Sequence, residues 1–406
     1  MATPQQAAAG KREVLEGAMA VAHAVARCRP EVIAAYPITP QTHISEELSQ
    51  IVADGDLEAE FVKVESEFGA ASVCLGASAA GARAYTATSS QGLILMCEVL
   101  WNMAGLRLPV VLGCANRSVS APLSIWVDHQ DAESIRDSGV LQFYAEDSQE
   151  ACDQHVIAFK VAEDRRVLLP VMVNLDGFLL THVFEPTELP DQAVVDQFLP
   201  PYRAVLKLDV DDPATFGTFT EPDKCMEGRW MVHDAAMRGL GVIEEASAAF
   251  EKTFGRPSGG LLEEYKSRDA ETVLVAKGSL CGTIKDVVDE ERERGRKVGL
   301  VRIKTFRPWP KAAVLKAVGH ARRIAVIERG ASFGAGGVMT PEIKETLYDA
   351  GKAVPVSGFC VQLGGREVTP DGLREIIERV SKGERQKAYE YFRLRTEILP
   401  DLVPGA

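Results

Sequence analysis

The 406-residue sequence contains eight cysteines, yet none of them forms a CxxC motif or any other close pair. Metal and iron–sulfur sites usually show such spacing. We therefore expect this chain to carry no iron–sulfur cluster. Most of the cysteines lie in apolar runs, which indicates small core residues in a reducing compartment.

Long apolar runs and basic stripes are also missing. No stretch approaches the roughly 18 to 20 apolar residues of a membrane span, and the first residues lack the apolar core of a signal peptide. We expect residues 1–11 to be a short disordered lead-in and the protein to be cytoplasmic. The net charge of −13 argues against non-specific binding to nucleic acid.

Two common phosphate-binding motifs do not occur. The sequence has no GxxxxGK[ST] loop and no GxGxxG loop. The run from Thr86 to Gly92, TATSSQG, resembles a phosphate-binding turn only weakly. A self-contained nucleotide-binding enzyme is therefore a minor alternative, which titration with NAD+ or ATP would test.

What the sequence does contain is a regular alternation of short apolar runs with segments of helical periodicity. This alternation predicts a doubly wound, largely parallel α/β sheet. We expect its strands at residues 32–38, 59–65, 83–88, 109–116, 141–145 and 167–175, and its helices at 12–27, 39–53, 67–79, 89–103 and 148–163.

The alternation stops at residues 178–229, where six prolines predict an irregular excursion before a helix at 230–254. We thus expect one domain over residues 12–255 and a second α/β domain over 265–383, followed by a charged helix at 384–392 and a tail to residue 406. Strands of the second domain are expected at 272–276, 298–303, 324–328 and near 356, and helices at 282–294, 310–318, 337–349 and 370–381.

Polar turns follow several of the predicted strands. They are the segments Tyr36 to Pro40, Glu65 to Glu67, and Asn116 with Arg117. Open α/β sheets bind ligands at the carboxyl edge of their strands. We therefore predict half of a cofactor site at this edge, with the other half on a different polypeptide.

Each of these residues also has an ordinary structural interpretation. Glu67 stands at a predicted helix start, where the helix dipole stabilises a carboxylate; alternatively, Glu67 or Glu65 binds a protonated ring nitrogen of a flat cofactor. Arg117 is either a surface ion-pair residue or a clamp for a substrate carboxylate. Thr39 is either a helix N-cap or a donor to a small ligand.

The loop Asp128-His129-Gln130-Asp131 concentrates two carboxylates and one imidazole. We interpret it as a hydrogen-bonded anchor rather than as a metal site, because no further ligand spacing supports a metal.

Taken together, these segments resemble the α subunit of the 2-oxoacid:ferredoxin oxidoreductases, a family best known from pyruvate:ferredoxin oxidoreductase. The likeness spans nearly the whole chain. The matching segments are YPITP (36–40), ESEFGA (65–70), TATSSQG (86–92), NRS (116–118), SIWVDHQD (124–131), DGF (176–178), TFRPWP (305–310), ERGASFG (328–334) and GGRE (364–367).

The resemblance implies a thiamine-diphosphate enzyme that converts a 2-oxoacid and coenzyme A into acyl-CoA and CO2 and passes two electrons to ferredoxin. The chain would supply the pyrimidine-binding domain and a transketolase C-terminal-like domain. Glu67 would bond the aminopyrimidine ring, while Arg117 and Thr39 would contact the substrate. The other residues that the resemblance places at the cofactor are Tyr36, Pro37, Ile38, Ser90 and Gln91.

Thiamine-diphosphate enzymes hold the diphosphate through Mg2+ with a GDG motif and a later Asn, and this pattern is absent: Gly55-Asp56 continues with Leu57. The resemblance assigns that motif and a proximal [4Fe–4S] cluster to a β subunit, with γ and ferredoxin-like δ subunits and, in some complexes, a flavin or NAD subunit. No metal is therefore expected on this chain.

Two further points stay open at the level of sequence. Fused single-chain members differ by one residue between the arginine and the DHxD loop, so the choice of Arg117 over Asn116 depends on the alignment. Pyruvate is the default substrate, and a branched-chain or aryl 2-oxoacid such as phenylglyoxylate, with NAD+ or ferredoxin as acceptor, is the alternative. A non-catalytic assembly subunit is the alternative of another class.

Overall fold

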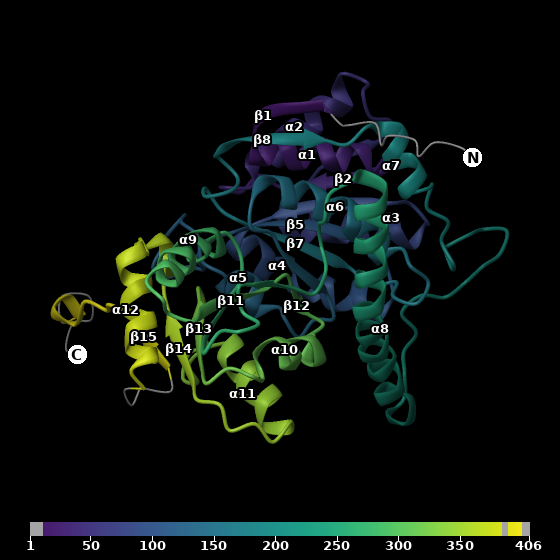
Figure 1. Ribbon diagram of the computed structural model, residues 1–406. Helices are drawn as coiled ribbons and strands as arrows, with labels where there is room; N and C mark the ends of the chain where they lie inside the picture. Colours follow the sequence, from purple (N-terminus) through teal and green to yellow (C-terminus); the bar gives the residue numbers. More distant parts are fainter. Residues whose placement is uncertain (1–10, 384–388, 400–406) are drawn as a thin grey trace, which may run out of the picture.

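Short runs, most of them buried and rich in Val, Ala and Leu, form the main sheet of the computed structural model, which describes residues 11–383 and 389–399 (Figure 1). The strand order is β12–β6–β7–β5–β4–β2–β3, and every neighbouring pair except β12–β6 is parallel. The strands are β2 (Val32–Ala35), β3 (Glu60–Lys63), β4 (Ala84–Thr88), β5 (Val111–Asn116), β6 (Leu141–Tyr144), β7 (Val171–Asp176) and β12 (Thr305–Arg307).

Helices cover both faces of this sheet. Two separate hydrophobic clusters show the division: one contains buried residues of α1, α2, α6 and α8, and the other contains buried residues of α3 and α4. The doubly wound arrangement predicted from the sequence is thus confirmed. The helices are α1 (Gly17–Arg27), α2 (Thr42–Ala53), α3 (Glu67–Ala79), α4 (Ser90–Gly105), α5 (Gln130–Ser134), α6 (Ser148–Ala162), α7 (Gln192–Phe198) and α8 (Pro222–Phe254).

A second sheet lies beside the first and is drawn in green to yellow in Figure 1. Its order is β15–β14–β13–β10–β11–β9, with only β9 antiparallel to its neighbour. The elements are β9 (Leu262–Tyr265), β10 (Thr272–Ala276), α9 (Leu280–Glu293), β11 (Val298–Ile303), α10 (Lys311–Val318), β13 (Arg323–Glu328), α11 (Met339–Asp349), β14 (Val356–Cys360), α12 (Pro370–Ser381) and β15 (Tyr389–Tyr391), with 3-10 turns at Leu363–Gly365 and Thr396–Ile398.

Three contacts join the two sheets. The short strand β12 follows β11 of the second sheet in the chain, yet it pairs with β6 of the first. One hydrophobic cluster includes side chains from both sheets, among them Leu112 and Val326. Glu150 of α6 forms a buried ion pair with Arg302 of β11, 2.5 Å between Oε2 and Nη1.

Some sequence predictions are wrong at the ends of the first unit. Residues 12–16 were expected to be helical, but β1 (Lys11–Glu16) forms a two-stranded antiparallel sheet with β8 (Phe184–Leu189). The excursion at 178–229 contains β8 and α7, and α8 begins at Pro222, eight residues before the predicted start at 230. Proline is well suited to the first turn of a helix.

The C-terminal prediction is also wrong where it can be checked. Tyr389–Tyr391 form a strand parallel to β14 instead of part of a helix. Residues 1–10 of the predicted lead-in lie outside the described residues, as do residues 384–388 and 400–406. Lys11, the last residue of that lead-in, begins β1. Of the eight cysteines, six are buried, as the core interpretation requires. Among the described residues, no helix is long and apolar enough to cross a membrane.

Candidate functional site

The turns that follow β2, β3, β4 and β5 lie at one edge of the first sheet, because these strands run parallel and are adjacent in the order β5–β4–β2–β3. They are the segments Tyr36 to Pro40, Glu65 to Glu67, Ser89 to Gly92, and Asn116 with Arg117. The sheet therefore places the polar turns predicted from the sequence on a common edge.

Glu67 is the first residue of α3 and only 7% exposed, whereas Glu65 is exposed. The Ser66 hydroxyl caps the helix by accepting a hydrogen bond from Gly69 N at 3.2 Å. The Glu67 carboxylate has no hydrogen-bond partner among the described residues. Glu67 thus keeps unused acceptor atoms beside the buried first turn of α4, whereas Glu65 faces solvent, so of the two candidates Glu67 is the one placed to meet a ligand.

Gly92 gives the Glu67 carboxylate its space. A Cβ atom at position 92 would lie 2.5 Å from Glu67 Oε1 and 2.5 Å from Thr88 Oγ1. Thr88 is fully buried, and its hydroxyl lacks a partner. A carboxylate and a hydroxyl thus converge on the first turn of α4 with unused hydrogen-bonding capacity.

Ser90 is held by protein partners. Its backbone has a φ of 50°, a left-handed conformation that is uncommon for a serine. Its N–H donates to Asp131 Oδ2 at 3.1 Å, and its hydroxyl donates to Ser118 O at 2.6 Å and lies 2.5 Å from Gln91 Oε1. Ser90 and Gln91 therefore shape the turn opposite Glu67, and the hydroxyl of Ser90 is already engaged.

Asp131 ties this turn to the end of β5. Besides Ser90, its carboxylate accepts hydrogen bonds from Arg117 N at 2.9 Å, Asn116 Nδ2 at 3.0 Å and Ala132 N at 2.7 Å. Burial raises the pKa of Asp131 to about 6, against the effect of these donors. The ionised carboxylate, which can accept all four bonds, organises the edge.

Arg117 and Thr39 are brought together. Arg117 is 8% exposed, and its Nη1 donates to Thr39 O at 2.8 Å while its Nε donates to Ser124 O at 3.2 Å. Arginine has five N–H donors, and Nη2 has no acceptor among the described residues. Asn116, by contrast, is fully buried and bonded to Asp131 and Asn174. The Oδ1 atom of Asn116 has no partner, but Asn116 is fully buried, so of the two residues Arg117 is the better placed to meet a ligand.

Thr39 does not cap a helix. Helix α2 begins at Thr42 with Gln41 at the N-cap position, so the N-cap interpretation of Thr39 is wrong. Gln41 N donates to Ile38 O at 2.7 Å, so Thr39 lies inside a turn that precedes the helix. Thr39, Tyr36 and Pro37 are exposed and Ile38 is partly exposed. These four residues form an open wall at the sheet edge.

The edge contains two groups of candidate residues rather than one. Thr39 and Arg117 are in direct contact, and Arg117 connects to Ser90 through Asp131. Glu67 faces Gly92, next to the turn that contains Ser90 and Gln91. Among the described residues, no hydrogen bond joins Glu67 to Thr39 or Arg117.

The loop from Asp128 to Asp131 is a hydrogen-bonded anchor, as the sequence indicated. Asp128 Oδ2 accepts from Gly364 N at 3.1 Å, and His129 N donates to Arg329 O at 2.7 Å, so the loop binds the second unit. His129 Nε2 lies 2.7 Å from Asp176 Oδ1, and burial lowers the pKa of His129 to about 3. The neutral imidazole is a donor in this network.

Sequence reasoning missed three participants. They are Asp131 as the organiser of two turns, Thr88 as an unpartnered hydroxyl, and the ion pair between Arg329 and Asp176 that joins the two units. The positions of Asp131 and Asp176 just beyond apolar runs were visible in the sequence. Their partners were not, because the contacts span separate segments of the fold.

The site fits one end of the thiamine diphosphate expected from the resemblance. A ring nitrogen that carries a proton needs a buried acceptor, and Glu67 supplies an unpartnered carboxylate. The small side chain of Gly92 and the unpartnered Thr88 hydroxyl leave space and a polar contact beside it.

Comparisons with known proteins identify relatives over nearly the whole chain. The family described as pyruvate flavodoxin/ferredoxin oxidoreductase, thiamine diphosphate-binding, matches residues 23–247, and the pyruvate:ferredoxin oxidoreductase core domain II matches residues 270–373. Pyruvate synthase subunit PorA of Methanosarcina barkeri is 48% identical over 394 residues, which cover 96% of this chain and 98% of that protein.

Two further relatives show how the sequence identity varies with the named substrate. Pyruvate synthase subunit PorA of Methanothermobacter thermautotrophicus is 49% identical over 92% of this chain and 96% of that protein. Ketoisovalerate oxidoreductase subunit VorA of Pyrococcus abyssi is 39% identical over 95% of this chain and 98% of that protein.

A solved structure has the same fold. It is the 2-oxoglutarate:ferredoxin oxidoreductase from Magnetococcus marinus with 2-oxoglutarate, coenzyme A and succinyl-CoA bound, with a TM-score of 0.70 and 18% sequence identity. The match covers 91% of this chain but only 65% of that one, so this chain spans about two thirds of its length.

Proposed function

The chain belongs to the pyruvate flavodoxin/ferredoxin oxidoreductase family, and on this basis we propose that it is the α subunit of a thiamine-diphosphate-dependent pyruvate:ferredoxin oxidoreductase. The enzyme converts pyruvate and coenzyme A into acetyl-CoA and CO2, and two electrons pass to ferredoxin. The observation that carries this proposal is 48% identity over almost the full length of a pyruvate synthase subunit.

Glu67 is the residue that we assign to the cofactor. Thiamine diphosphate, when bound, supplies the nucleophilic carbon that attacks the 2-oxoacid and accepts the electron pair released with CO2. The Glu67 carboxylate accepts a hydrogen bond from the protonated ring nitrogen and so holds a proton at that atom. Its burial at the start of α3 strengthens this bond, because the low local dielectric leaves it unscreened.

Arg117 and Thr39 are assigned to the substrate. The unused Nη2 edge of Arg117 binds the pyruvate carboxylate, and its bonds to Thr39 O and Ser124 O fix the guanidinium plane. Thr39 directs its exposed side chain toward the substrate oxygens. Asp131 positions both Arg117 and Ser90 through their backbone N–H groups.

The exposed wall of Tyr36, Pro37 and Thr39 supports a site that is shared with another chain. We assign the Mg2+-diphosphate motif and a proximal [4Fe–4S] cluster to a β subunit, since the sequence lacks the GDG motif and any close cysteine pair. Coenzyme A, γ and ferredoxin-like δ subunits, and in some forms a flavin or NAD subunit, complete the proposed assembly. Within this chain we place the two domains at residues 12–255 and 265–383.

A branched-chain 2-oxoacid is the second candidate substrate, because ketoisovalerate oxidoreductase subunits are also full-length relatives. Their identity of 39% is lower than the 45 to 49% of the pyruvate synthase subunits. We therefore expect pyruvate to have the higher kcat/KM. An aryl 2-oxoacid such as phenylglyoxylate belongs in the same substrate panel.

The test is a comparison of wild-type and Glu67→Gln complexes, purified with their partner chains, in 2-oxoacid-dependent dye reduction. We expect Glu67→Gln to lower kcat at least about 100-fold with every substrate, the size of effect that loss of a proton-transfer partner gives. Glu65→Gln is the matched control on the exposed neighbour and is expected to retain activity. Near-normal turnover in Glu67→Gln would contradict the assignment, and a preference for 2-oxoisovalerate would change the substrate.

A further inference from the structure

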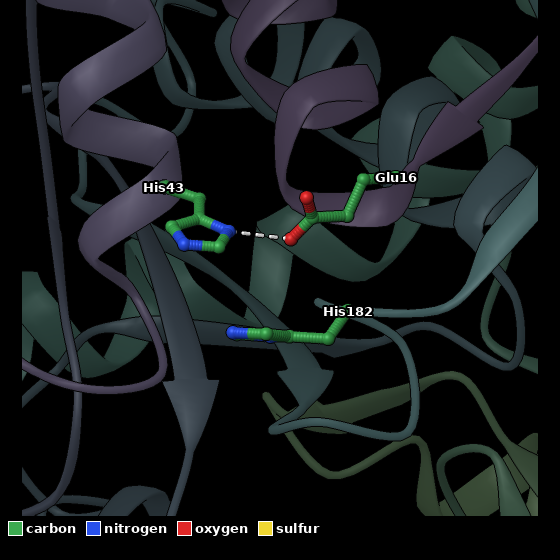
Figure 2. Close-up of side chains that lie close together, drawn as sticks. All are labelled: Glu16, His43 and His182. Carbon is green, nitrogen blue, oxygen red and sulfur yellow. Dashed lines mark hydrogen bonds and ion pairs between the residues drawn. The ribbon is translucent and has the colours of Figure 1, made fainter.

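A second cluster of functional groups shares no residue with those assigned above. Glu16 at the end of β1, His43 in the first turn of α2 and His182 in the loop after β7 approach one another from three separate segments (Figure 2). One carboxylate oxygen of Glu16 and one ring nitrogen of each histidine all lie within 4.8 Å of one another.

The three side chains retain unused ligand atoms. His43 Nδ1 lies 2.6 Å from Glu16 Oε1, and the rings of His43 and His182 are 4.7 Å apart between centroids. The Nε2 atoms of both histidines have no hydrogen-bond partner among the described residues. Glu16 is 8% exposed, so its charge faces the imidazoles instead of bulk water.

A hydrogen bond with Thr181 holds the orientation of the His182 ring. Its Nδ1 lies 2.7 Å from Thr181 Oγ1, and that hydroxyl oxygen also accepts a hydrogen bond from Phe178 N at 2.8 Å. A histidine that donates its Nδ1–H to an oxygen leaves Nε2 as a free acceptor. Metal-binding histidines typically have such a partner on the other ring nitrogen.

We propose that Glu16, His43 and His182 form a binding site for one divalent transition-metal ion such as Zn2+ or Co2+. Two imidazoles and one carboxylate suit these ions rather than Mg2+ or Ca2+, which prefer oxygen ligands. Ligand atoms at about 2.0 to 2.1 Å from a tetrahedral ion lie roughly 3.3 Å apart. The three ligand atoms now lie within 4.8 Å of one another, so binding would draw them closer together, and water would fill the fourth position.

The ion would add a cross-link between three segments, two of which already share the backbone hydrogen bonds from Gly17 N to Val183 O at 3.1 Å and from Ala18 N to Thr181 O at 2.9 Å. It would tie the junction of β1 and α1 to the first turn of α2 and to the loop after β7. The same two helices supply a natural comparison, because His23 of α1 lies 3.1 Å from Glu47 of α2 without a second histidine. That pair offers two ligands, whereas the proposed site offers three.

The experiment uses the untagged full-length chain, freed of metal with a chelator and titrated with Co2+. We expect d–d absorption bands that saturate at one equivalent, displacement of Co2+ by Zn2+, and a rise in the melting temperature with Zn2+. Glu16→Gln, His43→Gln and His182→Gln should each weaken Co2+ binding at least about 100-fold, since even the loss of an outer contact costs 10- to 100-fold. His23→Gln should bind as the wild type does.

A subtler variant tests the geometry without removing a ligand. Thr181→Val should weaken binding roughly 10-fold and Thr181→Ser should restore it. Melting curves without metal show whether each variant is folded. If a variant does not fold, the wild-type titration alone still shows whether the chain binds one ion. The proposal is overturned by a wild-type titration without saturation at one equivalent, by unchanged binding in Glu16→Gln and His182→Gln, or by a thiolate charge-transfer band that places the ion on a cysteine.

Discussion

At the scale of single residues, the environment of each side chain decides what it can do. Glu65 and Glu67 are two residues apart, yet one is exposed and the other is buried opposite Gly92. Asn116 and Arg117 are adjacent, yet the amide nitrogen of Asn116 is engaged in buried hydrogen bonds, whereas Arg117 keeps a free guanidinium edge. Chemical type alone would not separate the members of either pair.

Arg117 is the residue proposed to bind the substrate carboxylate. Arg117→Ala would then remove a charge-assisted hydrogen bond worth about 1.5 to 3 kcal/mol. We expect KM for pyruvate to rise roughly 10- to 100-fold in the assembled enzyme while the affinity for thiamine diphosphate changes little. Arg117→Lys keeps the charge without the planar fork, so its KM should lie between those of the wild type and Arg117→Ala. An unchanged KM in Arg117→Ala would contradict the carboxylate role.

The second prediction concerns Gly92. In Gly92→Ala the new Cβ atom would lie 2.5 Å from Glu67 Oε1, so the carboxylate must move. We expect a loss of kcat that approaches that of Glu67→Gln, measured by dye reduction, because misplacement of about 1 Å at a reacting group costs roughly 100-fold.

The control for this substitution is Gly76→Ala within α3, where a Cβ atom meets nothing within 4 Å. Alanine is favoured over glycine in a helix interior by about 1 kcal/mol. Gly76→Ala should therefore raise thermal stability and leave turnover unchanged. Full activity in Gly92→Ala would show that the position of Glu67 is not constrained by this contact.

At the scale of elements, Asp131 connects the starts of α4 and α5 to the end of β5. Asp131→Asn replaces one acceptor oxygen with an amide that must face N–H donors. Each buried donor left without a partner costs about 1 to 3 kcal/mol. We therefore expect a lower melting temperature and a lower kcat/KM at every pH.

The wild-type enzyme should show a related pH effect, because burial raises the pKa of Asp131 to about 6. As the pH falls through 6, protonation turns an acceptor into a donor, and kcat/KM should decline. The effect of Asp131 on folding stability runs the other way from its effect on kcat/KM. Because its pKa is raised, the folded state binds this proton more tightly than the unfolded state does. The contribution of Asp131 to the free energy of unfolding therefore increases as the pH falls toward 4. The decline in kcat/KM near pH 6 should be absent in Asp131→Asn.

The sequence predicted the elements whose own residues show a clear pattern, and it missed segments that become strands only by pairing with another segment. Most strands from β2 to β7 are short buried apolar runs, which can be recognised although their partners lie far along the chain, as Val111 and Val171 do. Residues 12–16 have apolar side chains at helical spacing, but Val14 is 65% exposed and β1 is held by β8, where Lys11 pairs with Leu189. No local signal reveals a partner so far along the chain.

The same limit applies to the site. Glu67, Thr39 and Arg117 stand at strand ends, which periodicity locates well. The direction of each side chain depends on Gly92, Thr88 and Asp131, which reach the edge from other segments. The helix expected near residue 390 was wrong because Tyr389 packs against Gly336, Gly337 and Gly358, a pocket that only the folded chain creates.

At the scale of the whole molecule, ion pairs support the contact between the two units. Arg302 of β11 pairs with Glu150 of α6, and Lys304 Nζ lies 2.8 Å from Glu150 Oε1. Burial opposes the charge, yet Arg302 and Lys304 lower the pKa of Glu150 to about 2. Glu150→Gln removes one of three carboxylates that pair with Arg302, since Glu146 and Glu263 remain. The loss of a charge-assisted bond costs about 1.5 to 3 kcal/mol and should lower the melting temperature at pH 7 by roughly 2 to 4 °C for a chain of this length.

The pH dependence of this effect follows from the depressed pKa. The stabilisation is present above the unfolded pKa of about 4.3 and is lost as the pH falls toward 2. The melting temperatures of Glu150→Gln and wild type should therefore converge in acid. Glu245→Gln, which disrupts only an exposed pair with Arg166, is the control and should shift the melting temperature little. A constant difference at all pH values would rule out the ion pair as its source.

The pairing of β12 with β6 affects how the chain can be divided. A fragment that ended in the loop after Gly255 would retain β6 but lose β12. Its first sheet would then expose a row of free N–H and C=O groups along β6, a surface that recruits strands from other molecules and promotes aggregation. The second unit thus shields the first from self-association, and the two are better exchanged between proteins together than one at a time.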